Sequence, residues 1–285
     1  MNPHPGTEPD PIAPPPVPWT QAYLERRTRV LAQAIRDDDL LARLSAPGPL
    51  PDGYGLGLDE RCVEYPWLLA HLPPGHARVL DAGSALNHGL LLERPVLAEK
   101  QLHIVTLAPE PDCFWQQRVS YVFEDLRQLP FKDSFYDIVI SVSTLEHVGC
   151  DNTFYTGGFS SSEKRLDDFK IAGRELTRVL KPGGLLLLTV PYGTYQFHGA
   201  FQQFDRQRLS DAEESLGAMS DVSEVFYRYS KSGWQMATDD ECANAEYVAW
   251  VAELMRSGRW PAAPGLEPDY AAAARAVACV RLVKA

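Results

Sequence analysis

Hydrophobic residues in the second part of the chain form short runs separated by segments with helical spacing. Seven of these runs have the length, composition and flanking turn residues of β-strands. They cover residues 78–82, 102–107, 119–123, 136–142, 184–190, 222–229 and 276–283. Because strands and helices alternate, the pattern predicts an α/β fold in which helices cover both faces of a mostly parallel sheet. This sheet domain is expected to occupy residues 77–285.

Several connections in the sheet domain carry specific signals. Residues 163–180 have helical periodicity and are followed by Lys181-Pro182-Gly183-Gly184, a stop and turn, so we expect a complete β-α-β unit there. The connection 107–119 is too short for a full crossover helix and leaves room for about one turn. Two longer stretches, at about 191–220 and 230–275, are expected to be lid insertions. The second is alternatively a contact between copies of the chain, which would make the protein a homo-oligomer.

The N-terminal part has a different pattern. Residues 1–18 contain eight prolines and almost no large apolar side chains. They cannot bury enough surface to offset the entropy of ordering, so we expect a disordered tail. Apolar residues recur at helical intervals from residue 19 to about 44, which predicts an amphipathic helix with Thr20 as its N-cap. A second helix is predicted for residues 60–72, and residues 19–76 are therefore expected to form a helical extension or lid.

Composition and charge argue against several classes of protein. With 45% hydrophobic and 23% charged residues, the chain has the composition of a globular protein. Its net charge of −11 and the lack of a dense Lys or Arg run argue against a nucleic-acid partner. Five widely spaced cysteines without a CxxC pair indicate reduced thiols and no metal site. Without a secretory signal or a run of 18 apolar residues, we expect a soluble, cytoplasmic protein with no membrane partner.

A turn of small residues follows the first predicted strand of the sheet. The strand ends in Asp81, and the turn continues through Gly83, Ser84 and Ala85 to Asn87 before a helical segment. In such a turn, backbone N–H groups can approach a ligand closely at the N-terminus of a helix. A tight strand-to-helix turn that binds nothing is the alternative interpretation.

Four further segments follow this turn in a recognisable order. They are Phe123-Glu124-Asp125-Leu126, Leu129-Pro130-Phe131, Tyr136-Asp137-Ile138-Val139-Ile140-Ser141 and Leu180-Lys181-Pro182-Gly183-Gly184. In order and spacing, the five motifs resemble the small-molecule branch of the class I S-adenosylmethionine-dependent methyltransferases, over residues 60–284. The resemblance implies a Rossmann-like sheet of seven strands with an antiparallel last strand. It also implies that S-adenosylmethionine lies across the carboxyl ends of the first four strands.

The resemblance assigns cofactor contacts to particular residues. In the family, backbone at the positions of Asp81 and Gly83 cradles the methionine and sugar parts, so the neighbouring Ser84, Ala85 and Asn87 belong to the same candidate site. Asp125 matches the acid that accepts the adenine amino group, and Leu126 packs on the ring. Ser141 and Ser143 end the strand that passes beside the sulfonium.

This chain departs from the family pattern at two places. Ala85 and Asn87 stand where further glycines are usual, which narrows the turn. The acid that normally closes the second strand and holds both ribose hydroxyls is missing, and Glu110 is the nearest substitute. A surface glutamate without this role, or a polar group from the N-terminal helices, is an equal alternative for the ribose contact.

Candidate catalytic and substrate residues follow the fourth and fifth strands. His147 could accept the proton of a hydroxyl acceptor, or could instead cap a helix or support the loop. Glu146 could bind a substrate hydroxyl or ammonium, or could be a buried support. Aromatic and imidazole rings after the fifth strand are expected to form a substrate wall. Its members are Tyr192, Tyr195, His198 and Phe201.

Taken together, these features predict an enzyme that methylates an oxygen, or alternatively a nitrogen, of a small molecule such as a sugar or a natural-product intermediate. Carbon methylation of a small molecule or lipid is one alternative, because lipid-modifying relatives carry a run like Glu146-His147-Val148-Gly149. A second is a non-catalytic scaffold with a methyltransferase-like fold, because the turn and the ribose acid depart from the pattern. An open cleft lined by His147 would argue against the scaffold.

Overall fold

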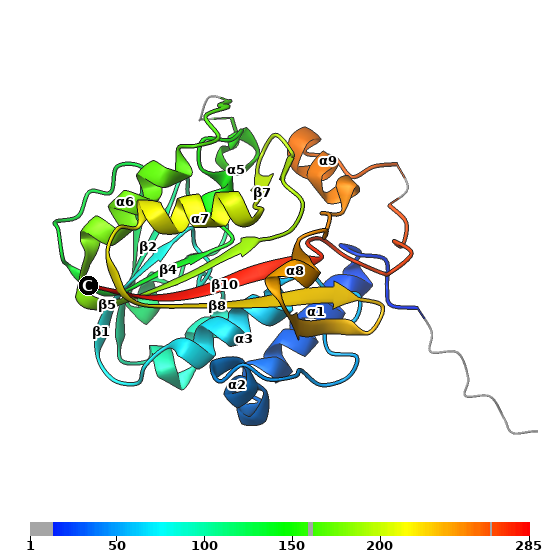
Figure 1. The fold of residues 1–285 in the computed structure, drawn as a ribbon, viewed down its shortest axis with the longest axis horizontal. Coiled ribbons are helices and arrows are strands. Elements are labelled where there is room, and N and C mark those ends of the chain that lie inside the picture. Colours follow the sequence, from blue (N-terminus) through cyan, green and yellow to red (C-terminus); the bar gives the residue numbers. More distant parts are fainter. Residues whose placement is uncertain (1–13, 159–161, 263) are drawn as a thin grey trace, which may run out of the picture.

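The computed structural model describes residues 14–158, 162–262 and 264–285, and these form an α/β structure around one large sheet (Figure 1). Of the predicted tail, residues 1–18, the first thirteen lie outside the described residues. Within the described ranges the sheet has eight strands. In spatial order they are β3 (Val119–Phe123), β2 (Lys100–Thr106), β1 (Ala77–Ala82), β4 (Tyr136–Val142), β5 (Leu180–Pro191), β10 (Ala276–Lys284), β8 (Met219–Ser230) and β9 (Gly233–Ala237).

The strand directions agree with the predicted Rossmann-like fold. β1 pairs in parallel with β2 and β4, β2 with β3, and β4 with β5. The last strand, β10, lies antiparallel between β5 and β8. Chain order reverses between β1 and β4, and at such a switch point two neighbouring connections leave the sheet on opposite faces.

The predicted count of seven strands is wrong, because β9 adds an eighth. It pairs antiparallel with β8 in a hairpin closed by Ser230 and Gly233. Sequence patterning missed it because an edge strand is bonded on one side only and is half exposed to water. Its sequence, Gly-Trp-Gln-Met-Ala, is therefore no continuous apolar run.

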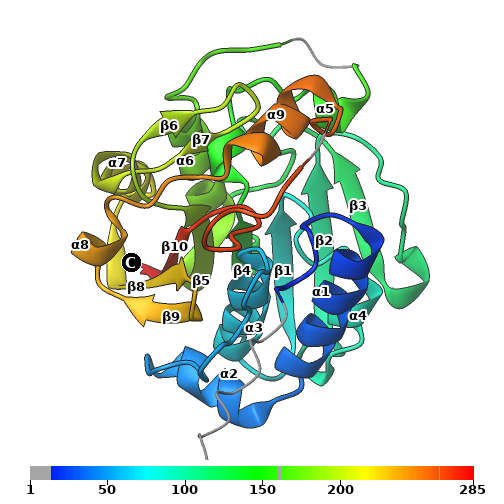
Figure 2. The ribbon, with the colours of Figure 1, turned by 90° about the vertical axis from the view of Figure 1, so that its right-hand side faces the viewer.

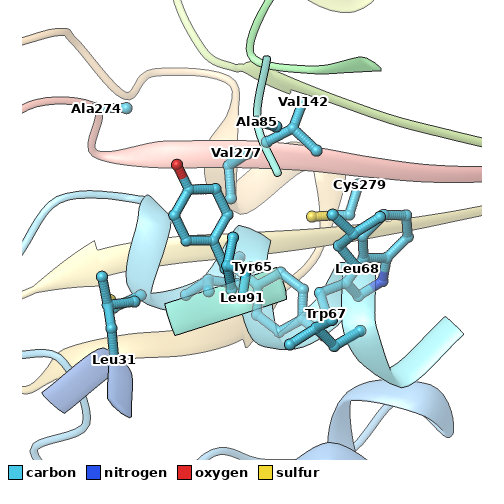
Figure 3. Packing of buried hydrophobic residues seen from close by; sticks show 14 of the residues in the cluster. Leu31, Tyr65, Trp67, Leu68, Ala85, Leu91, Val142, Ala274, Val277 and Cys279 are labelled. Carbon is cyan, nitrogen blue, oxygen red and sulfur yellow. The ribbon is translucent and has the colours of Figure 1, made fainter. Parts of the chain in front are cut away.

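On one face of the sheet lie the N-terminal helices α1 (Gln21–Ala34), α2 (Asp38–Ser45) and α3 (Arg61–His71) (Figures 1 and 2). The single helix predicted for residues 19–44 is two helices, because the Asp37 carboxylate accepts a bond from Leu40 N and starts α2 afresh. The predicted Thr20 cap of α1 is confirmed. Side chains of α3, among them Tyr65, Trp67 and Leu68, pack with Val277 and Cys279 of β10 (Figure 3).

The opposite face is covered by α6 (Phe169–Val179) and α7 (Arg206–Ser215). The helix predicted for residues 163–180 begins six residues late, because Glu163 and Asp168 form ion pairs with Arg127 outside the helix. The single turn expected between β2 and β3 is the 3₁₀ helix η2 (Trp115–Gln117). In the described part of the chain, no helix has the length and apolarity needed to cross a membrane.

Short elements line the carboxyl edge of the parallel strands. They are η3 (Leu145–His147), α5 (Thr153–Thr156), the hairpin of β6 (Gln196–Phe197) and β7 (Gln202–Gln203), α8 (Asp239–Cys242) and α9 (Ala249–Ser257). Two further short elements, α4 (Gly89–Leu92) and η1 (Pro95–Leu97), lie in the connection from β1 to β2. α5 and α9 contact each other although they are about ninety residues apart in the chain (Figure 2). The edge of the sheet is therefore surrounded by segments from both halves of the sequence.

Candidate active site

A cavity of about 700 Å³ lies at the carboxyl ends of the first four parallel strands. Its wall takes residues from the turn after β1, from 106–111 after β2, from 124–127 after β3 and from 142–149 after β4. The N-terminal helices and α5 complete it. In open α/β sheets ligands bind in this position, and the volume suits a cofactor or a drug-sized molecule.

The turn after β1 is held by a buried carboxylate. Asp81 accepts hydrogen bonds from Ala85 N at 3.1 Å and Leu86 N at 2.7 Å, and it is fully buried. Burial raises the pKa of Asp81 to about 7, although the two backbone bonds oppose this shift. Asp81 does not line the cavity, so its side chain shapes the turn from behind.

Gly83 and Ser84 have left-handed backbone conformations in this turn, with φ of +116° and +71°. A Cβ on Gly83 would lie 2.0 Å from Thr144 Oγ1, so only glycine lets the loop after β4 approach this closely. Both residues line the cavity together with Ala85. Ser84 Oγ is buried and has no hydrogen-bond partner in the described part of the protein.

Asn87 and Glu110 form a small polar network beside the turn. Asn87 Nδ2 donates to Glu110 Oε2 at 2.7 Å and to the Asp112 carbonyl at 3.1 Å, and Tyr121 donates to Asn87 Oδ1 at 2.7 Å. Glu110 lines the cavity, whereas Asn87 is buried behind it. The segment after β2 is thereby fixed against the turn after β1.

Asp125 lines the cavity next to Leu126, at the end of β3. Both of its oxygens accept bonds from the Arg127 side chain at 2.5 to 3.0 Å, and one also accepts Arg127 N at 2.8 Å. Although burial opposes it, this pairing holds the pKa of Asp125 below its usual value. Arg127 also binds Glu163 and Asp168, so Asp125 is an ionised and positioned acceptor.

His147 lines the cavity at the end of η3. Its Nδ1 lies 2.8 Å from the Ala200 carbonyl oxygen. Because a carbonyl only accepts, Nδ1 carries the hydrogen and Nε2 of the neutral ring has a free lone pair. Burial, helped by the nearby Arg61 charge, lowers the pKa of His147 to about 4. The neutral His147 ring thus has a free Nε2 lone pair, which the predicted role as a proton acceptor requires.

Glu146 and the two serines of the fourth strand are buried. Glu146 is 2% exposed, and its Oε1 lies 3.9 Å from His147 Nε2. Ser143 lines the cavity and donates to Glu64 Oε1 at 2.6 Å. Ser141 is fully buried in β4 and does not reach the cavity. The structure thus brings Ser143 and His147 into the wall and leaves Ser141 and Glu146 behind it.

Comparison with known proteins adds to this geometry. Residues 95–188 match the family model of a methyltransferase domain. This stretch of the chain is a methyltransferase domain. The cofactor of this domain is S-adenosylmethionine. A search of the curated proteins gives no match.

Two solved structures illustrate how distant the similar folds are from this methyltransferase. The [4+2]-cyclase SpnF is 17% identical, over 74% of this chain and 75% of its own, with a TM-score of 0.43. The 1,6-didemethyltoxoflavin-N1-methyltransferase of Burkholderia thailandensis, with bound 1,6-didemethyltoxoflavin and S-adenosylhomocysteine, is 13% identical over 98% and 94%, with a TM-score of 0.44. At this similarity neither structure bears on the acceptor used here.

The residues of the cavity fit S-adenosylmethionine. Gly83 lines the cavity and adds no side chain to the wall, and the buried Ser84 hydroxyl lacks a hydrogen-bond partner in the described residues. Glu110 and Asp125 place carboxylate oxygens in the wall after β2 and β3, where the family needs acceptors for ribose and adenine. Glu110 Oε2 accepts one bond from Asn87 and keeps a second lone pair for a ligand, whereas each Asp125 oxygen already accepts two bonds from Arg127, one of which a ligand would share or replace.

The four side chains of the substrate wall expected after β5 do not line this cavity. Tyr192 is fully buried and donates to Asp239. The Arg208 guanidinium lies over the Tyr195 ring, with Cζ 5.1 Å from the centroid of that ring. His198 and Phe201 stack on each other at 4.7 Å, and Phe201 supports the ring of His147 from behind. These contacts hold the four rings outside the cavity wall, with Phe201 directly behind His147.

Sequence patterning missed the aromatic and cationic side chains that do line the methyltransferase cavity. They are Arg27, Arg61 and Tyr65 from the N-terminal helices and Phe154 and Tyr155 from α5. No local pattern separates an arginine that faces a cavity from one on a solvated helix face. The adjacent aromatic residues Phe154 and Tyr155 were the available signal for α5.

Proposed function

We propose that this methyltransferase transfers the methyl group of S-adenosylmethionine to a nucleophilic oxygen or nitrogen of a small molecule held beside His147. One observation carries the proposal. A single cavity combines the glycine turn, two carboxylates after β2 and β3, and a neutral imidazole with a free Nε2 lone pair.

The cofactor contacts are proposed as follows. Backbone of Gly83 and Ser84 would cradle the methionine part, Glu110 would accept the ribose hydroxyls, and Asp125 with Leu126 would hold the adenine. When bound, the cofactor supplies a methyl group on positively charged sulfur. Its thioether is a good leaving group, so an acceptor that is held in line needs little further activation.

His147 would orient the acceptor and take its proton. The bond to Ala200 fixes the ring so that Nε2 is the basic atom. With a pKa of about 4, the imidazole is neutral at physiological pH and is a weak base. Its main contribution is therefore a directed hydrogen bond to the acceptor, and proton transfer follows as the acceptor loses electron density.

The surrounding segments are proposed to close the cavity. Arg27, Arg61 and Tyr65 support a lid role for residues 19–76, because they form part of the wall. Phe154 and Tyr155 offer ring faces against which a flat or cyclic acceptor, such as a sugar or natural-product intermediate, would pack. The net charge of −11 supports a small molecule over a nucleic acid in the same site.

Calorimetric titration with S-adenosylmethionine and S-adenosylhomocysteine tests this function. We expect wild type to bind both, and Asp125→Ala to weaken binding by about tenfold, because a charged hydrogen-bond acceptor is lost. Asp133→Ala is the matched control, because that aspartate is exposed and lies outside the cavity. Folded wild-type protein that binds neither compound would overturn the proposal.

A further inference from the structure

Arg61 occupies a place that does not favour a cation in its own helix. It is the first residue of α3, where the positive end of the helix dipole repels a positive charge. Its Nη1 donates to Glu64, three residues later in the same helix. The side chain lines the cavity and is 25% exposed. The cavity therefore explains the position of this guanidinium better than the helix does.

The pairing with Glu64 leaves one edge of the Arg61 guanidinium unused. Neither Nε nor Nη2 has a hydrogen-bond partner in the described part of the chain, and neither belongs to the fully buried atoms that lack one. Both nitrogens are therefore accessible from the cavity. Their N–H groups point in the same direction and can donate two parallel bonds to the two oxygens of one carboxylate.

Glu64 fixes this guanidinium at the side of the cavity that lies away from the predicted cofactor contacts. Its other oxygen, Oε1, accepts the hydroxyls of Ser143 and Thr189, both at 2.6 Å. These hydroxyls lie at the carboxyl ends of β4 and β5. The proposed ribose and adenine contacts follow β2 and β3, on the far side of β1 in the sheet. Arg61 is thus held on the same side as His147, which follows β4.

The acids around Arg61 leave its charge available to a ligand. Glu64 is its only ion-pair partner among the residues that the structure describes. Burial and the neighbouring Asp59 raise the pKa of Glu60 to about 7, and burial raises the pKa of Glu146 well above its usual value. Both acids therefore carry little negative charge at neutral pH. A guanidinium that is largely removed from water gains free energy from a second charged acceptor.

Aromatic rings form the wall near Arg61 and His147. The Arg61 guanidinium lies over the Tyr65 ring, with Cζ 5.9 Å from its centroid. Tyr155 lies edge-on to His147, with ring centroids 5.2 Å apart. Both tyrosines line the cavity together with Phe154. Such ring faces suit a flat, apolar ligand body, for example another aromatic ring.

We propose that Arg61 binds a carboxylate on the methyl acceptor, and that this acceptor is a small aromatic hydroxy acid. This inference rests on the proposed function and deepens it. The two carboxylate oxygens accept bonds from Nε and Nη2 of Arg61, and the hydroxyl donates to His147 Nε2. As the hydroxyl oxygen forms its bond to the methyl carbon, the C–S bond breaks and its electron pair stays on sulfur. The hydroxyl proton passes to His147 Nε2.

Calorimetry in the presence of saturating S-adenosylhomocysteine tests the acid site. The probes are 4-hydroxybenzoate and 4-hydroxyphenylacetate, each compared with its neutral primary amide. We expect at least one acid to bind about tenfold more tightly than its amide, because charged hydrogen bonds are the stronger ones. Arg61→Met should abolish this preference. Arg61→Lys keeps the charge but loses the paired N–H groups, and should reduce the preference to about threefold.

Arg256→Met is the matched control. Arg256 also forms an ion pair with a glutamate three residues away in its helix, Glu253, but it lies on α9 and outside the cavity. We expect this variant to keep the full preference for the acid. A loss in the control equal to that in Arg61→Met would overturn the specific role of Arg61.

The remaining outcomes separate the two proposals. If folded wild type does not bind S-adenosylhomocysteine, the proposed function fails. If it does, but neither acid binds more tightly than its amide, the acid site is wrong and the methyltransferase function stands. Should Arg61→Met fail to fold, Arg61→Lys decides, and an undiminished preference in that variant would overturn the site.

A further probe separates the acceptor from the cofactor. 5′-Methylthioadenosine lacks the amino-acid part of S-adenosylhomocysteine and therefore has no carboxylate. If Arg61→Met weakens the binding of S-adenosylhomocysteine but not of 5′-methylthioadenosine, and the preference for the acid persists, Arg61 holds the cofactor's own carboxylate. That result would overturn the acid site. We expect instead that the variant changes the affinities for both compounds by the same small factor.

Discussion

The side-chain amide of Asn87 donates a 2.7 Å hydrogen bond to the carboxylate of Glu110. This contact links the two places at which the chain departs from its family's pattern. Asn87 stands where a glycine is usual in the turn after β1, and Glu110 lies four residues beyond β2, which ends without an acid. The amide holds the Glu110 carboxylate at the cavity wall, and we propose that the two departures compensate each other.

Replacing Glu110 should therefore weaken cofactor binding. We expect Glu110→Ala to lower the affinity for S-adenosylhomocysteine by about tenfold, because a charged acceptor is lost. Asn87→Ala should give a smaller loss, since the acid remains but is no longer held. Isothermal calorimetry measures both. Glu99→Ala, an exposed glutamate before β2, serves as control, and an equal loss there would argue against the specific role of Glu110.

Adding one methyl group to Gly83 should destabilise the protein. Gly83→Ala places Cβ against Thr144 in a left-handed conformation, and we expect a loss of about 3 kcal/mol in the free energy of unfolding. Gly183 also has a positive φ, of +71°, but no heavy atom lies within 4 Å of the Cβ that Gly183→Ala adds, so this variant should cost about 1 kcal/mol. Urea denaturation compares the two variants. Equal losses would show that the contact with Thr144 does not matter.

Removing Arg127 should leave Asp125 without a cation, while Glu163 and Asp168 keep only their longer pairs with Arg165 at 3.2 Å. Arg127→Met separates the carboxylates of Asp125, Glu163 and Asp168 from their common cation, whose side chain is 18% exposed. We expect a loss of about 2 kcal/mol in unfolding free energy and weaker binding of S-adenosylhomocysteine. Arg256→Met breaks an exposed pair with Glu253 and should cost less than about 1 kcal/mol. If both variants cost the same in chemical denaturation, the network is not structural.

Acid should destabilise the fold through His147. The unfolded chain gains a proton on this imidazole below its ordinary pKa of 6.5, whereas the folded protein does so only near pH 4. Stability is therefore lost as the pH falls from 6.5 to 4, by up to about 3 kcal/mol. His147→Asn should lack this component. Unfolding free energies at about pH 7, 5.5 and 4.5 test the difference, and parallel curves for the two proteins would contradict it.

Sequence patterning alone determined the sheet and the order of the motifs. All seven predicted runs overlap strands of the sheet, because buried parallel strands need continuous apolar residues that are visible without any knowledge of neighbours. Asp81, Gly83 and Asp125 were identifiable because each lies within two residues of the carboxyl end of a strand, and in a parallel sheet the carboxyl ends of neighbouring strands meet at one edge. The Asp37 side chain that caps α2, and so divides the predicted first helix into two, was also visible in the sequence. As a signal it is weaker than the helical periodicity of residues 19–44.

The tertiary structure decided which of these side chains face the cavity. Asp81 and Ser141 lie behind the wall, the rings after β5 turn away from it, and Tyr65 and Tyr155 enter it from elements far apart in the chain. The partners of Glu110 and His147, which are Asn87 and the Ala200 carbonyl, lie 23 and 53 residues away. Local spacing cannot predict such contacts, because the direction of a side chain at the end of a strand depends on how the following loop packs against other loops.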